Sequence, residues 1–317
     1  MKRYMSVGLP LLVLSMVDPV YAAAIPSALQ GVVVSERVTH DTRSGIFTYD
    51  YRVHNPTINN GQLQIITIDI SRAPDAAILS SDGLVNGPDY LSASSALSFQ
   101  RVPMVAVGMR GPEGWASALG LRGDTAPHGV AQWGTIDARF RILPGRTLGG
   151  FQLTSRGLPG IRTMTIRPGI DYDNLPDEFT ENVEKTRALL DRLTFRTSSV
   201  GPTAPPQNLV VFEFLNYLIS LVHDSRQLGW IREGEEQREL LKILLRAKRR
   251  LEANEPAKAA KRLEKFLKEV REESCQTFRC SRQKALTSEA FALLFFNGQF
   301  LFDHLPSPTH DRDDDGD

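Results

Sequence analysis

Hydrophobic and polar residues alternate with a period of two over much of the segment between residues 29 and 170. In residues 47–53, large apolar or aromatic side chains occupy every second position, and polar side chains lie between them. Residues 66–70 and 136–142 repeat this alternation. A strand with one buried face has this period, because successive side chains point to opposite faces of a sheet. We therefore expect strands at these three places.

Turn-forming residues separate these runs. They lie at residues 41–45, at residues 55–61 and in Pro-Gly pairs that begin at Pro144, Pro159 and Pro168. Proline fixes φ at the first central position of a type II turn, and glycine accepts the positive φ at the second. Short strands with this spacing predict an antiparallel β-sandwich over residues 25–197, with one short helix near residues 180–193.

The period of the hydrophobic pattern changes after a proline-rich stretch. Residues 198–208 include Gly201-Pro-Thr-Ala-Pro-Pro206, which lacks apolar periodicity and predicts an extended linker. Over residues 209–305, apolar side chains recur every three or four positions, which is the period of an amphipathic helix. Four such runs joined by short turns predict a C-terminal antiparallel four-helix bundle. The pattern thus indicates a multidomain β plus α protein.

Residues with capping preferences mark the ends of the expected helices. Gly229 follows the first helix as a candidate C-cap. Asn254 stands before the third helix as a candidate N-cap, with Pro256 in its first turn, where a missing N–H does no harm. Thr287 precedes the fourth helix and is expected to cap it.

Several residues of the helical region carry a resemblance to a known module. They are Phe214-Leu-Asn-Tyr-Leu-Ile, Gly229-Trp230-Ile231, Leu263-Glu-Lys-Phe266 with Val270, and the closing Leu286-Thr-Ser-Glu-Ala290 with the residues to Leu305. The region resembles the FIMAH domain, a small helical unit near the C-terminus of secreted bacterial proteins, many of them hydrolases. The resemblance implies an accessory module rather than a catalytic one. The β region is assigned to no family.

Residues 1–22 have the pattern of a secretory signal peptide. Lys2 and Arg3 form a basic start, residues 7–17 are apolar apart from Ser15, and small residues precede a cleavage site after Ala22. The apolar stretch is too short to span the ~30 Å of hydrocarbon in a bilayer. We therefore expect a protein without a transmembrane anchor that is secreted to the extracellular space or the periplasm.

Export affects how the two cysteines are interpreted. Cys275 and Cys280 lie close together in the sequence, and thiols outside the cytoplasm usually oxidise. A zinc site would need further ligands, and the nearest histidines in sequence are His223 and His304. The sequence therefore predicts a disulfide between Cys275 and Cys280.

Length and charge narrow the class of protein. A chain of 317 residues has room for two domains, and 41% apolar with 23% charged residues excludes global disorder. Lys and Arg number 37 and Asp and Glu number 37, so the net charge is zero. This balance gives no electrostatic reason to expect a nucleic-acid partner.

The β region lacks the common motifs of catalysis. Its sequence has no Gly-x-Ser-x-Gly elbow, no His-Glu-x-x-His helix and no Gly-rich phosphate loop. Asp124 and His128 are close enough to share one loop, and Ser95 or Ser117 could supply a nucleophile. Such a triad keeps a secreted hydrolase open as the alternative to a non-catalytic protein.

The Gly-rich stretch 111–134 is the candidate ligand site. It contains Trp115, Arg122, Asp124, His128 and Trp133. An indole beside carboxylate and guanidinium groups can bind a sugar ring by stacking and hydrogen bonding. The alternative is that both tryptophans fill the core of the sandwich, since aromatic residues are mostly buried.

Two further features concern charge. The second and third helices are rich in basic residues, namely Lys242, Arg246, Lys248, Arg249, Arg250, Lys258, Lys261, Arg262, Lys265 and Lys268. Interleaved glutamates favour a solvated, ion-paired face, and an anionic cell-wall polymer or lipid surface is the alternative partner.

The last residues, 306–317, form an acidic tail. Asp311, Asp313 and Asp315 with Gly316 match the first half of a calcium loop, although the remaining ligands are missing. A weak calcium site or a plain acidic tail are both consistent with this sequence, and no other cofactor is expected.

Together these features predict a secreted, non-enzymatic binding, adhesion or accessory protein. Its expected ligand is an extracellular polysaccharide, another component of the cell envelope or another extracellular protein. A hydrolase with an unrecognised catalytic β domain is the second hypothesis, and a structural subunit of an extracellular assembly is the third.

Overall fold

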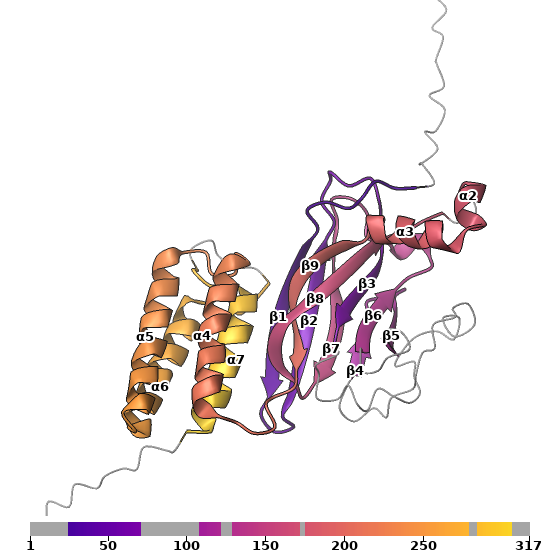
Figure 1. The fold of residues 1–317 in the computed structure, drawn as a ribbon. Coiled ribbons are helices and arrows are strands. Elements are labelled where there is room, and N and C mark those ends of the chain that lie inside the picture. Colours follow the sequence, from indigo (N-terminus) through magenta and orange to yellow (C-terminus); the bar gives the residue numbers. More distant parts are fainter. Residues whose placement is uncertain (1–24, 71–107, 122–128, 172–174, 279–283, 306–317) are drawn as a thin grey trace, which may run out of the picture.

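The computed structural model describes residues 25–70, 108–121, 129–171, 175–278 and 284–305 (Figure 1). The expected signal peptide at 1–22 and the acidic tail at 306–317 lie outside these residues.

Two antiparallel sheets form the first part of the fold. One has the strand order β1 (Val33–Asp41), β2 (Ile46–His54), β7 (Thr147–Ser155) and β4 (Gly108–Arg110). The other has the order β5 (Ala116–Leu121), β6 (Gly129–Gly134), β3 (Leu63–Asp69), β8 (Leu158–Pro168) and β9 (Phe195–Thr203). The alternation at 47–53 and 66–70 therefore correctly predicted β2 and the end of β3.

Aromatic side chains fill the space between the two sheets. Tyr51 of β2 lies 5.7 Å from Trp133 of β6, measured between ring centroids, and Phe151 of β7 lies 6.0 Å from the same indole. All three side chains are fully buried. The inward faces of both sheets thus form one aromatic core.

The strand expected at 136–142 is wrong. Residues Ala138–Phe140 form a short 3₁₀ helix instead, and Ile136 is exposed. The Asp137 side chain accepts a hydrogen bond from the Arg139 backbone N–H at 2.9 Å and forms an ion pair with the Arg139 guanidinium. This local bonding by an Asp side chain competes with a sheet ladder.

The turns at the Pro-Gly pairs were predicted with mixed success. Gly145 has a φ of 77°, and the Arg146 N–H bonds to the carbonyl of Leu143, as a type II turn requires. Pro159 and Gly160 lie within β8, so no turn occurs there.

The expected linker at 198–208 also needs correction, because its first half is part of a sheet. Residues 198–203 belong to β9, which pairs with β8 along its length. Pro202 lies directly opposite Pro159 in this ladder. Since β9 is the last strand of its sheet, a proline without an N–H is tolerated there, and the connecting segment begins only at Ala204.

The remaining described elements are helical. Two short helices, α2 (Asp177–Thr180) and α3 (Val183–Leu193), precede β9, and α3 matches the helix expected near 180–193. Four helices follow, α4 (Val211–Gln227), α5 (Gly234–Glu252), α6 (Pro256–Glu273) and α7 (Ser288–Asp303). Neighbours in sequence contact each other, and α7 also contacts α4. Among the described helices, none is both long and apolar enough to cross a membrane.

Of the three predicted helix caps, Thr287 is correct, since it caps α7 by accepting a hydrogen bond from the Ala290 N–H. Leu228 is the C-cap of α4, and Gly229 is the next residue, with a φ of 75°. Asn254 is not the N-cap of α6, because Glu255 occupies that position. Asn254 instead has a φ of 55° in the turn after α5, a left-handed conformation that asparagine tolerates better than most residues.

Helix α7 joins the helical region to the sheets. It contacts β1, β8 and β9, and in Figure 1 it lies between the other helices and the strands. Phe296 of α7 packs edge-on against Phe47 of β2, with ring centroids 5.3 Å apart. Buried apolar residues of both parts form one contiguous cluster, so sheets and helices share an interior.

Candidate functional site

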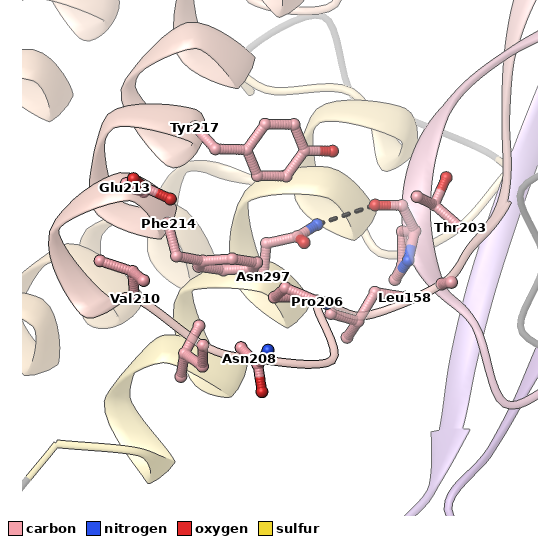
Figure 2. A pocket seen from close by; sticks show the side chains of 12 residues that line it. Leu158, Thr203, Pro206, Asn208, Val210, Glu213, Phe214, Tyr217 and Asn297 are labelled. Atoms are coloured by element: carbon pink, nitrogen blue, oxygen red, sulfur yellow. Dashed lines mark hydrogen bonds between the residues drawn. The ribbon is translucent and has the colours of Figure 1, made fainter.

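A pocket of about 310 Å³ lies where the sheets and the helices meet (Figure 2). Its walls come from the ends of β8 and β9, the connecting segment 204–210, α4 and α7. Leu158 and Thr203 form one wall, and they face each other across the β8–β9 ladder.

The connecting segment forms one side of the pocket. Pro206 lacks a backbone N–H and cannot donate a ladder hydrogen bond that would extend β9. The segment bends at residues 207–208, and α4 follows Val210, whose carbonyl accepts the first helical bond from the Phe214 N–H.

Asn297 of α7 forms the inner part of the pocket. Its side chain is 1% exposed, and its Nδ2 donates to the carbonyl oxygens of Pro159 and Leu293, each at 2.8 Å. Both amide hydrogens are thus committed to backbone acceptors, which fixes the side chain. Within the described residues no donor reaches its Oδ1, which leaves that oxygen as an acceptor for a ligand.

Aromatic residues of α4 line the mouth. Phe214 is buried, whereas Tyr217 is 37% exposed, and their ring centroids lie 5.6 Å apart in an edge-on arrangement. Figure 2 shows the Tyr217 ring above the pocket, with the Glu213 side chain beside Phe214. Glu213 lies in the first turn of α4, where the helix dipole favours a negative charge.

This arrangement is suited to recognition. The pocket offers a partly exposed aromatic ring, an amide oxygen, one carboxylate and otherwise mostly apolar walls. Clefts of this composition bind small ligands through apolar contact and a few placed polar groups. Glu213 supplies the one carboxylate among the described lining residues.

The tryptophans expected to bind sugar lie elsewhere. Trp115 is 5% exposed and Trp133 is fully buried. Their indole N–H groups donate to the carbonyls of Phe140 and Arg110, both at 2.9 Å. Both rings therefore fill the core of the sheets, which is the alternative that the sequence left open, and their faces are not available to stack on a ligand.

The other predicted site residues are mostly not described. Arg122, Asp124 and His128 lie outside the described residues, as do Asp311, Asp313 and Asp315 of the expected calcium site and Ser95 of the hydrolase alternative. Ser117 lies in β5 and is fully buried. In the described ranges, no group of three or more His, Cys, Asp or Glu residues is placed to hold a metal ion.

The predicted disulfide is described at one end only. Cys275 is buried after the end of α6 and is not a free thiol. Cys280 lies outside the described residues, so its pairing with Cys275 stays a prediction.

Two buried glutamates meet where α7 covers β1. The Glu36 backbone N–H donates to Glu289 Oε1 at 3.0 Å, and Ser199 of β9 donates its hydroxyl to Glu36. Burial, and after it the neighbouring Glu289 carboxylate, raises the pKa of Glu36 well above its usual value. The site lacks an opening to solvent, since Glu36 is 1% and Glu289 6% exposed, so we interpret it as a structural contact between α7 and the sheets.

Sequence reasoning missed the pocket because its walls are far apart in the chain. The useful signal was Tyr217, an aromatic residue one helical turn from Glu213 in the first helix after the proline-rich connection. That signal identifies one wall only.

Comparisons with known proteins add little. No protein-family model matches the chain, and no curated protein matches it. The solved structure of an uncharacterized protein from Nocardia farcinica, described as having an immunoglobulin-like fold, is similar at 8% sequence identity with a TM-score of 0.29. That match covers 54% of this chain and 98% of the other. Function is therefore inferred from the site itself.

Proposed function

We propose that the protein is an exported, non-catalytic binding protein that holds an extracellular saccharide in the pocket between its sheets and its helices. In this proposal the sheets form a β-sandwich, and α4–α7 form a four-helix bundle of FIMAH-like type that acts as an accessory element. The signal-peptide pattern of residues 1–22 supports export.

The partly exposed Tyr217 ring carries the proposal. A sugar presents an apolar face that stacks on an aromatic ring and hydroxyl groups that need acceptors. The Glu213 carboxylate and Asn297 Oδ1 supply acceptors on two sides of the same pocket. A partly exposed ring and a fixed amide with an unused acceptor thus line the same pocket, and this combination supports a saccharide ligand.

Glycan arrays probed with the full chain and with Tyr217→Ala test the proposal. We expect the substitution to weaken retention on the bound glycan by about tenfold or more, because it removes the stacking surface. Phe212→Ala is the matched control, since Phe212 also lies on α4 and is also 37% exposed but does not line the pocket.

Two outcomes would contradict the proposal. The first is that no glycan retains the folded full chain. The second is that the array retains the Tyr217→Ala and Phe212→Ala variants equally well. Circular dichroism of each variant shows whether the fold is intact.

A further inference from the structure

Four arginines line a second pocket, of about 390 Å³, on the helices α5 and α6. They are Arg246, Arg249 and Arg250 of α5 and Arg262 of α6. Positions 246, 249 and 250 have the spacing of one helix face, so their side chains project together. In Figure 1, α5 and α6 lie on the side of the helical region away from the sheets.

Most of the positive charge in this pocket is not neutralised by protein carboxylates. Arg250 Nη1 lies 2.6 Å from Glu255 Oε2, but the same carboxylate also accepts from Lys258 Nζ at 2.6 Å. Across the described part of the chain, no carboxylate lies within ion-pair distance of Arg246, Arg249 or Arg262. Like charges gathered in one pocket repel each other, and a bound anion relieves that repulsion.

On neighbouring turns of the same helices, basic side chains form ion pairs with glutamates. Glu239 of α5 pairs with Lys242 at 3.0 Å and with Lys265 of α6 at 3.7 Å. Farther along α6, Lys268 lies 3.8 Å from Glu272. The arginine pocket thus gathers three guanidinium groups without an ion pair, whereas ion pairs of the kind expected from the sequence occur on other turns of the same two helices.

The residue type indicates the ligand. Guanidinium groups bind phosphate and sulfate oxygens in a bidentate manner that lysine cannot reproduce. Several such groups around one pocket can bind more than one oxyanion at the same time. We propose that the pocket binds a polyvalent oxyanion, in which phosphate or sulfate groups are adjacent to one another. This site is independent of the saccharide pocket.

Titration calorimetry of the full chain with tripolyphosphate and with inorganic phosphate tests the proposal. We expect tripolyphosphate to bind, inorganic phosphate to bind far more weakly, and both affinities to fall with added salt. Arg246→Gln/Arg249→Gln should weaken tripolyphosphate binding by about a hundredfold, since each charge-assisted bond lost costs about tenfold.

Arg238→Gln/Lys268→Gln is the matched control. It removes the same amount of positive charge, one residue from α5 and one from α6, and both residues are exposed and lie outside the pocket. Retained binding in this variant supports a specific pocket. Equal weakening in the two double variants, or no binding of tripolyphosphate to the unmodified chain, would overturn the proposal.

Vesicles distinguish the source of the oxyanion. Phosphatidylcholine vesicles that contain phosphatidic acid are used in a co-sedimentation assay. If the full chain and the control variant co-sediment with these vesicles but Arg246→Gln/Arg249→Gln does not, the ligand is a lipid headgroup. If tripolyphosphate binds in calorimetry while such vesicles do not sediment the chain, the ligand is a soluble or polymeric polyanion. Sedimentation of all three proteins alike would contradict a specific pocket.

Discussion

Among single residues, Glu236 of α5 is half-buried next to other carboxylates. Burial, and after it the carboxylates of Glu269 and Glu273 on α6 and of Glu233 and Glu239 around α5, together raise its pKa to about 7. Its buried Oε1 has no hydrogen-bond partner. The ionised form is therefore disfavoured in the folded state.

Glu236→Gln should stabilise the protein at alkaline pH. Because the folded pKa is raised, protonated Glu236 favours the fold below its ordinary pKa of 4.5, and this advantage is lost as the pH rises through about 7. The amide carries no charge, so the variant should unfold at higher urea concentration than the native chain at about pH 8 and show no difference near pH 4. Urea titrations across this range measure the effect.

The exposed Glu264→Gln on α6 is the control, because it removes a carboxylate without relieving Glu236. An equal gain in the control, or a gain of Glu236→Gln that does not depend on pH, would contradict the assignment.

Between elements, the contact of α7 with β8 depends on Asn297. Pro159 lies opposite Pro202, and neither proline can donate an N–H across the ladder. The carbonyl of Pro159 accepts from Asn297 instead, which ties the helix to the sheet at a buried position.

Asn297→Ala should destabilise the chain by about 1–3 kcal/mol, because it leaves the Pro159 carbonyl buried without a donor. Gln299→Ala removes an exposed side-chain hydrogen bond to Asp303 on the same helix and should have little effect. Denaturant unfolding of the native chain and the two variants measures these changes in the free energy of unfolding. A loss in Asn297→Ala no larger than that in Gln299→Ala would show that the bond does not hold α7 to the sheet.

The sequence was most informative about elements whose pattern is local. Alternation identified β2 and β3, and the three-to-four-residue period identified the helical region. It failed at 136–142, where the side chain of Asp137 bonds to its own neighbour, and at 198–203, where prolines suggested a linker. Proline excludes a residue from a central strand but not from an edge strand, and the position of a strand within its sheet depends on distant pairings.

Candidate sites were harder to predict for the same reason. The two tryptophans were assigned to a ligand site from their neighbours in sequence, whereas their burial depends on β2 and β7, which lie far from them in the chain. The pocket lined by Tyr217 and Asn297 and the arginine pocket both combine residues from elements that meet only in the fold. Their residue types could be read from the sequence, but not their convergence.

For the whole molecule, the relevant feature is the interior shared by sheets and helices. The proline-rich connection suggested two modules with separate cores. Instead, α7 covers the side on which β1 and β9 lie, and its apolar residues continue the cluster that fills the space between the sheets. Covering an edge strand with a helix also protects it from pairing with other chains.

We therefore expect the chain to unfold in one cooperative transition. Trp115 and Trp133 lie in the sheets and Trp230 lies in the helical region, so the fluorescence of a Trp230→Phe variant reports on the sheets, and far-ultraviolet circular dichroism reports mainly on the helices. The two signals should change at the same denaturant concentration, because loss of either part exposes apolar surface of the other.

The Phe296→Ala variant tests whether sheets and helices unfold together. Phe296 contacts Phe47 and His40 across the boundary between helix and sheet, with centroid distances of 5.3 and 6.1 Å. Its removal should lower the midpoints of both signals together, since the contact belongs to both parts. Two transitions in the native chain, or a shift confined to the helical signal in Phe296→Ala, would mean that the helices fold as an independent unit and that the shared interior contributes little to stability.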